Sequence, residues 1–257
     1  LRMSRGLGDV YKRQADYWKE KIGNLQEYQY GYHKGWSMIL DTLTWPVLIM
    51  MLICIGIAPI FAGEYQSKCD SLILCMKYGR SKLILAKIIS GWLYATGVYW
   101  GITLIYSSIY MIFLGTQGAD LPIQLKYPAM SVGYNLTMGE AVGITLLLGY
   151  FFTLGIMGIT LFMSALLKNT YAVIIVAFLL IIIPTFLSLD TGGYVWSHVL
   201  SLLPPKIADF SFQSYTAYSI GNIVLSWPVM AILVNAIVAV LCSVLGYIIF
   251  RKHQVNK

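Results

Sequence analysis

The chain has 257 residues, of which 58% are hydrophobic and 11% charged, and its mean hydropathy is +0.70. Soluble domains average about 45–50% apolar and about 25% charged residues, so the composition excludes an ordinary soluble protein and indicates an integral membrane protein. The net charge of +7 does not point to nucleic acid, because basic residues of membrane proteins collect in cytoplasmic loops. The length suits one compact helical bundle.

The first residues are interpreted as a non-native leader. Residues 4–14, "SRGLGDVYKRQ", can be encoded by a nucleotide string similar to a common transposase-type sequencing adapter. They lack the apolar core of a signal peptide, and the alternative interpretation is a short basic arm. We therefore assign residues 1–14 to an adapter-derived leader, expect the natural N-terminus to lie upstream, and assign residues 15–37 to an extracellular segment.

Five apolar segments are long enough to cross a bilayer, which requires about 20 mostly apolar residues. We expect an all-α transmembrane domain over 38–250, followed by a cytoplasmic tail at 251–257. The expected spans are 38–62, 88–114, 141–167, 171–189 and 223–250. Prolines inside or beside these spans are expected to kink or begin helices. They are Pro46, Pro184 and Pro228.

The placement of lysine and arginine predicts the orientation. If residues 63–87 are cytoplasmic, that side carries nine basic residues and the other side carries five over longer loops, outside the leader. The nine are Lys68, Lys77, Arg80, Lys82, Lys87, Lys168, Arg251, Lys252 and Lys257. The C-terminus is then cytoplasmic. A chain that starts outside and has five spans is expected to lack an earlier helix, which agrees with the adapter interpretation.

Few ionisable residues are expected at membrane depth. Asp41, Glu140 and Asp190 lie near span ends, and Glu140 is placed where a helix N-terminus favours a carboxylate. Proton- or ion-coupled transporters usually carry acids or histidines inside their spans, so this pattern counts against that class. Asn235 lies among apolar residues. We expect it to form an interhelical hydrogen bond, with a substrate contact as the alternative, and treat it, Pro184 and Pro228 as candidates for a packing or path role.

No catalytic or metal-binding motif is present in the sequence. There is no nucleophile–base arrangement and no phosphate-binding loop of the form G-x-x-x-x-G-K-[ST]. Cys69 and Cys75 are spaced neither as a metal pair nor as a redox pair, so the cysteines are expected to be free, and the scattered histidines predict no metal site.

Glycines of the third expected span predict close helix packing. They are Gly143, Gly149, Gly155 and Gly158.

The most charged part of the chain joins the first two expected spans, "GEYQSKCDSLILCMKYGRSKLILAKI" at 63–88. Residues 66–78 predict a short amphipathic helix, which Gly79 is expected to end, while Ser81 is expected to cap the following helix. The apolar residues of this helix are Leu72, Ile73 and Met76, and its polar residues are Lys68, Asp70 and Lys77. An interfacial helix on anionic lipid and a docking helix for a cytoplasmic partner both fit this pattern.

The order of these features resembles that in the permease subunits of type 2 ABC exporters. In that family a helix ends in Gly-Glu or a similar acid, and a short coupling helix, a turn and a lysine entering the next helix follow. The matching residues are Glu64, Leu72 to Leu74, the turn Gly79-Arg80-Ser81, and Lys87. The order Gly-Arg-Ser departs from the commoner Ser-Arg. "LTMGEAV" at 136–142 and "SALLKN" at 164–169 resemble the start of the family's fourth helix and the turn before its fifth. The outer segment 190–222, which contains Leu203-Pro204-Pro205, resembles its external hairpin before the last helix.

The resemblance implies a six-helix permease in a bacterial plasma membrane, of which this chain contains the last five helices. Two permease subunits, identical or different, would form an export path across the lipid bilayer. Two separate ATPase subunits, which bind ATP and Mg, would each hold a coupling helix, so this chain would be no enzyme and would bind no cofactor directly. Leu72, Ile73 and Met76 would be the buried anchors of that contact. The charged Lys68, Asp70, Lys77 and Arg80 would set its orientation.

Three other classes of membrane protein are alternatives to a permease. Buried charge in the missing helix would favour a secondary transporter or channel. A membrane-bound enzyme would need clustered catalytic residues, which the sequence does not contain. A sensor or immunity protein built on the same bundle fits the sequence as well as a permease does. Peptides, lipids, drugs and ions all remain open as substrates.

Overall fold

The structure is a computed structural model, and it describes residues 12, 16, 31–43, 46–69, 75–76, 79–127, 134–187, 193–210, 212, 217–220 and 223–252. These residues belong to two compact units. One unit comprises residues 1–44, 106–148 and 209–232, and the other comprises 45–105, 149–208 and 233–257.

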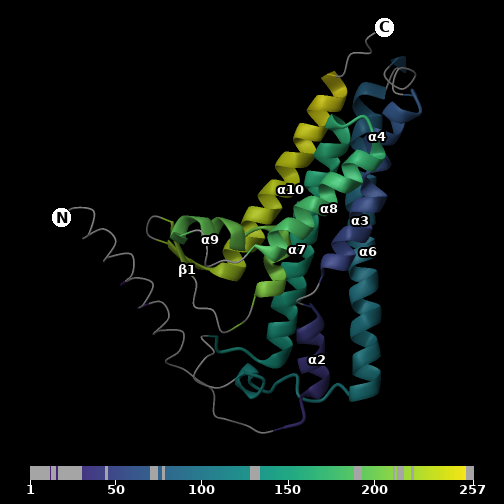
Figure 1. The fold of residues 1–257 in the computed structure, drawn as a ribbon. Coiled ribbons are helices and arrows are strands. Elements are labelled where there is room, and N and C mark those ends of the chain that lie inside the picture. The colour runs from purple at the N-terminus through teal and green to yellow at the C-terminus, as the bar shows by residue number, and fades with distance from the viewer. Residues whose placement is uncertain are drawn as a thin grey trace, which may run out of the picture. The chain divides into compact units, whose positions relative to one another are not determined.

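Helices make up most of the described chain (Figure 1). The α-helices are α2 (Lys34–Leu43), α3 (Val47–Ile57), α4 (Pro59–Gln66), α6 (Ile84–Leu114), α7 (Met138–Leu166), α8 (Thr170–Phe186), α9 (Gly193–Ser201) and α10 (Trp227–Lys252). A π-helical turn, η1 (Gly79–Leu83), precedes α6, and two 3₁₀ turns are η2 (Ile123–Leu125) and η5 (Pro204–Asp209). The strands β1 (Ala217–Ile220) and β2 (Ile223–Ser226) form an antiparallel hairpin.

Four segments of the described chain are long and apolar enough to cross a membrane. They are Val47–Gln66, Ser81–Leu114, Met138–Leu166 and Trp227–Lys252. Helix α8 is also apolar but has 17 residues, the short limit for a spanning helix. The prediction of a mostly helical membrane protein is therefore confirmed at this level, with four full-length spans in place of five.

The first predicted helix, 38–62, differs from the structure because it is divided in three. Pro46 lies directly before α3, and Pro59 is the first residue of α4. Proline lacks the amide hydrogen of a helix interior but is well tolerated at a helix start. Two prolines therefore divide the single expected helix into α2, α3 and α4.

The later spans differ from the predictions mainly at their ends. The last helix begins at Trp227 and not at residue 223, because residues 223–226 pair with 217–220 in the hairpin. Branched side chains such as Ile223 and Val224 favour strands. The fourth predicted helix, 171–189, ends at Phe186, after which Leu187 is extended.

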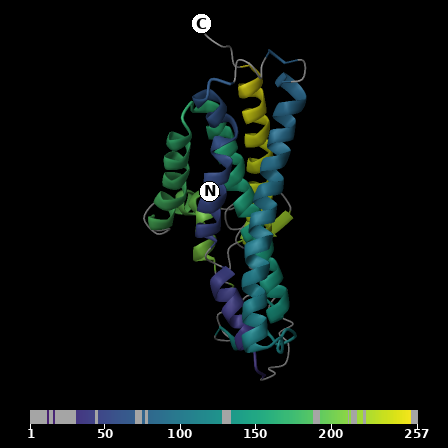
Figure 2. The ribbon, with the colours of Figure 1, turned by 90° about the vertical axis from the view of Figure 1, so that its right-hand side faces the viewer.

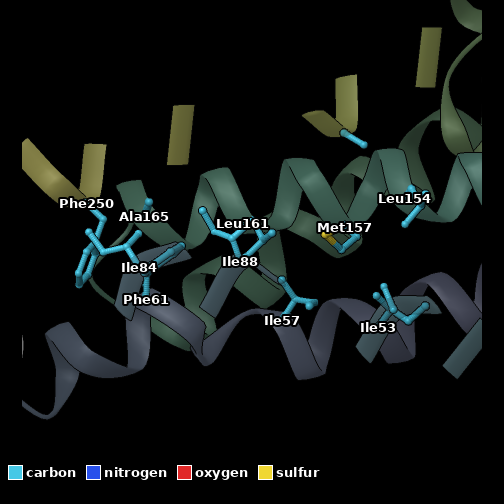
Figure 3. Packing of buried hydrophobic residues seen from close by; sticks show 12 residues of the cluster. Ile53, Ile57, Phe61, Ile84, Ile88, Leu154, Met157, Leu161, Ala165 and Phe250 are labelled. Atoms are coloured by element: carbon cyan, nitrogen blue, oxygen red, sulfur yellow. The ribbon is translucent and has the colours of Figure 1, made fainter. Parts of the chain in front are cut away.

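One hydrophobic cluster packs the second unit, and Figure 3 shows its members. It contains Ile53, Ile57 and Phe61 of α3 and α4, Ile84, Ile88 and Ala95 of α6, Leu154, Met157, Leu161 and Ala165 of α7, and Ala239 and Phe250 of α10. The rings of Phe61 and Phe250 have their centroids 4.7 Å apart. Helix α3 also lies beside α8, as Figures 1 and 2 show. Because lipid is as apolar as these side chains, close van der Waals contact holds such helices together.

Three of the four α7 glycines that were predicted to pack closely lie against neighbouring helices. A Cβ atom at Gly158 would lie 2.7 Å from the Cα of Ala239, and one at Gly155 would lie 2.6 Å from Oδ1 of Asn235. A Cβ atom at Gly149 would lie 2.5 Å from the hydroxyl oxygen of Tyr99, whereas no atom of the described residues lies within 4 Å of the Cβ position at Gly143. The packing prediction is confirmed for the first three and is wrong for Gly143.

In the first unit, α7 begins with a capping box. The backbone N–H of Thr137 donates to Oε2 of Glu140 at 2.9 Å, and the N–H of Glu140 donates to Oγ1 of Thr137 at 3.3 Å. This reciprocal pair satisfies two amides that the helix itself leaves without partners. The predicted placement of Glu140 at a helix N-terminus is confirmed.

Candidate functional site

The charged connection between α4 and α6 covers residues 67–83, and its first end is a defined turn. The N–H of Lys68 donates to the carbonyl of Tyr65 at 3.3 Å, and the N–H of Cys69 donates to the carbonyl of Glu64 at 3.1 Å. This is the Schellman pattern of helix ends. Lys68 has a φ of +56° and takes the left-handed position that glycine usually fills. The chain therefore leaves α4 in a fixed direction.

The middle of the connection is described only in part. Asp70, Leu72, Ile73 and Lys77 lie outside the described residues, so the amphipathic helix at 66–78 stays a prediction. Met76 is described, and 52% of it is exposed.

The second end of the connection differs from the prediction. Gly79, Arg80 and Ser81 belong to η1, which continues directly into α6. The backbone before α6 is thus already helical. Ser81 lies inside a helical turn and does not cap α6.

An ion pair joins the two helices that flank the connection. Nζ of Lys87, in the second turn of α6, contacts Oε1 of Glu64 in α4 and also donates to the carbonyl of Ile60 at 3.0 Å. The side chains of Lys87 and Glu64 are 25% and 14% exposed. Oε2 of Glu64 is buried and makes no hydrogen bond within the described residues. The carboxylate therefore depends on Lys87 to compensate its lost hydration.

Further hydrogen bonds fix the end of α4 to the turn between α7 and α8. The hydroxyl of Tyr65 donates to the carbonyl of Ala165 at 3.2 Å, and Nε2 of Gln66 donates to Oδ1 of Asn169 at 3.0 Å. The same Asn169 oxygen caps α8 by accepting the N–H of Tyr171 at 2.9 Å. We call the residues of the ion pair and of these bonds the connection base. They are Ile60, Glu64, Tyr65, Gln66, Lys87, Ala165 and Asn169.

Exposed basic residues surround the connection base. They are Lys68, Lys82, Lys168, Arg251 and Lys252. Lys168 adjoins Asn169, and Arg251 follows Phe250, whose ring lies 5.4 Å from that of Tyr65. Glu64 is the acidic residue described at this end, and it is already paired. The described surface around the base is therefore positive, which suits anchoring and charge matching.

The three residues predicted for packing or path take no part in the hydrogen bonds that define the connection base. Asn235 is almost fully buried, and its Nδ2 donates to the carbonyl of Leu202 at 3.1 Å. Pro184 is buried near the end of α8, and Pro228 is the second residue of α10. These positions fit packing and helix termination.

In the first unit a lysine is partly buried outside the segments long enough to span. Nζ of Lys126 donates to Oδ1 of Asp41 at 2.7 Å and to the carbonyl of Ser37 at 2.8 Å. Burial lowers the pKa of Lys126, and the nearby charge and hydrogen bond of Asp41 oppose that shift. Asp41 belongs to α2, so it does not lie at the end of a span as predicted.

The sequence did not predict the polar residues that form hydrogen bonds at the connection base and at the ends of α8. Asn169 directly before an apolar run is a recognisable N-cap signal. Lys206 is buried, and its Nζ donates to the carbonyl of Leu187 at 2.6 Å, just past the end of α8. A cation at a helix C-terminus is favourable, but the sequence does not show which helix end Lys206 reaches.

The comparisons with known proteins give a family and no named relative. A search of curated proteins found no match to this chain, and a search of solved structures found none either. Within the described residues, no group of three or more His, Cys, Asp or Glu side chains could hold a metal ion. A family model described as "Protein of unknown function (DUF2705)" matches residues 21–255, and the chain belongs to that family.

Proposed function

We propose that this chain is the membrane-spanning subunit of an ATP-driven ABC exporter, and that the connection at 67–83 docks onto a separate ATPase subunit. The observation that carries the proposal is the Glu64–Lys87 ion pair, which joins α4 to α6 at the root of the connection. A docking loop can transmit a displacement only if both of its ends are fixed to the helices that it moves. The connection base meets that requirement.

The charge around the connection base supports a cytoplasmic location. Exposed Lys68, Lys82 and Lys168 lie at this end, as do Arg251 and Lys252. Basic residues beside spans are typical of the cytoplasmic side. The C-terminus would then be cytoplasmic too, in a bacterial plasma membrane.

The surface of the connection suits a protein partner. Met76 is exposed and apolar, and the exposed Lys68 and Lys82 flank it in the chain. Apolar anchors with charged residues around them are typical of protein interfaces. The sequence has no phosphate-binding loop, so ATP and Mg would bind to the partner. The partner's closure on ATP would push the connection, and the Glu64–Lys87 pair would move α4 and α6 together as one rigid body. A second permease subunit, identical or different, would complete the path.

Site-specific cross-linking in the native membrane tests the proposal. A photoreactive amino acid replaces Met76 in the full chain, and the matched control carries it at Ile112, which is 78% exposed near the other end of α6. We expect the Met76 probe to form an adduct with a chain that contains a G-x-x-x-x-G-K-[ST] loop, and the Ile112 probe to form none. Adducts of Met76 with lipid alone would contradict the proposal and favour an interfacial helix.

A further inference from the structure

The span Val47–Gln66 is interrupted at Ala58, where α3 ends and α4 begins. Pro59 has no amide hydrogen, so it cannot donate to the carbonyl four residues earlier, and its ring crowds that carbonyl. Inside a membrane, freed backbone groups need other partners, because no water is present to supply them.

A side chain of another helix binds three backbone groups beside this break. Ser164 of α7 is fully buried, and its hydroxyl donates to the carbonyl of Ala58 at 2.7 Å. The same oxygen accepts the N–H of Phe61 at 3.1 Å and the N–H of Ala62 at 3.0 Å. One hydroxyl thus binds backbone groups on both sides of the break. Insertion of a side chain into a helical hydrogen-bond ladder is a known cause of helix kinks.

The same backbone groups have a second set of partners within their own chain. In an uninterrupted helix the N–H of Phe61 would donate to the carbonyl of Ile57, and that of Ala62 to the carbonyl of Ala58. An exchange from the Ser164 hydroxyl to these carbonyls leaves the amides of Phe61 and Ala62 bonded. Two arrangements with similar hydrogen bonding would make the junction bistable, and switching proteins use such elements.

The helix beyond the break carries both partners of Lys87. Ile60 and Glu64 belong to α4, so a rotation of α4 at the junction takes the start of α6 with it. Such a rotation breaks the hydrogen bond between Tyr65 and Ala165, which is partly buried, and the exposed one between Gln66 and Asn169.

We propose that the Ala58–Pro59 junction is a hinge and that the Ser164 hydroxyl is the latch that holds α4 in the position that the structure shows. The part of this inference that concerns export rests on the proposed function, because only there would a partner drive the hinge. The hinge and its latch are properties of the chain alone.

Distance measurements by pulsed electron resonance test the hinge in the full chain, in lipid nanodiscs without any ATPase. One spin label is placed on the native exposed Cys69 and the other on Leu179→Cys of α8, with Cys75 and Cys242 replaced by serine and the buried Cys54 retained. Cys69 follows α4 and therefore reports its position relative to α8.

The variants separate the latch from general packing. Ser164→Ala removes the hydroxyl and is expected to shift the equilibrium about tenfold toward a released position, seen as a second distance. Pro59→Ala restores an amide at the break and is expected to populate the same second distance. Thr145→Val removes a buried hydroxyl whose bond within the described residues is to its own helix, at the carbonyl of Ala141, and is expected to match the parent.

Three results would overturn the inference. The first is a Ser164→Ala distribution equal to that of the parent. The second is a different second distance in Ser164→Ala and Pro59→Ala. The third result is used if Ser164→Ala does not fold. It is a distance distribution in Pro59→Ala, which keeps the Ser164 hydroxyl, equal to that of the parent. Because no ATPase is present, these outcomes are independent of the Met76 cross-linking that tests the exporter proposal.

Discussion

Replacing Lys87 by Met is the sharpest test of the connection base. The variant keeps most of the aliphatic stem and removes the cation, so Glu64 loses its ion pair and Ile60 loses a donor to its carbonyl. Fully exposed ion pairs contribute about 0–1 kcal/mol, whereas removal of one partner from a buried pair costs about 3–5 kcal/mol. With side chains 25% and 14% exposed, this pair lies between these limits. We expect a loss of about 2 kcal/mol in the free energy of unfolding.

A thiol-reactive dye provides the assay. Cys54 is buried in the folded chain, so its reaction with the dye during heating in detergent reports unfolding. Cys69, Cys75 and Cys242 are replaced by serine to remove accessible thiols. A chain of this size loses about 2–4 °C in Tm per kcal/mol, so Lys87→Met should lower the Tm by about 4–8 °C.

Two further variants decide whether the pair itself is responsible. Glu64→Gln combined with Lys87→Met leaves no uncompensated carboxylate and should recover at least half of the lost Tm. Lys168→Met changes an exposed lysine nearby and should stay within about 0.5 kcal/mol of the parent. The reasoning is refuted if Lys87→Met matches Lys168→Met, or if the double variant is no more stable than Lys87→Met.

Three further predictions concern α7 and the connection. In the same thermal assay, Gly158→Ala should cost about 1–3 kcal/mol, because its Cβ would press on the backbone of α10, whereas Gly143→Ala has open space and should be neutral or stabilising by up to about 1 kcal/mol. Thr137→Ala should cost about 1 kcal/mol by removing the oxygen that accepts the amide of Glu140, and Thr137→Ser should restore most of the loss. Leu72→Asp should abolish export by whole cells without changing the Tm, and normal export by this variant would contradict the exporter proposal.

The sequence by itself determined the helical membrane class and the approximate limits of most spans. The predicted spans 88–114 and 141–167 correspond to α6 and α7 within a few residues at each end. These limits were predictable because lipid offers no hydrogen-bond partners to the backbone. A sufficiently long apolar segment therefore satisfies its backbone groups by forming a helix. The placement of Glu140 was equally predictable, since a capping box depends on residues three apart in the chain.

The start of the last helix and the break in the first span were harder to predict. Residues 223–226 continue an apolar run whose hydropathy suits strand and helix equally, and the pairing with 217–220 decides between them. Pro59 marks a weak point in the helix, but the sequence does not reveal which side chain supplies the missing partners.

Only the tertiary structure decided which polar groups meet. Both Glu64 and Lys87 stood out in the sequence as matching a family pattern, yet their contact joins residues 23 positions apart on different helices. Ser164 lies more than 100 residues from the backbone groups it binds. Local periodicity fixes which face of a helix is apolar. The depth and rotation of each helix against its neighbours fix which hydrogen bonds form, and those follow from the packing of the whole unit.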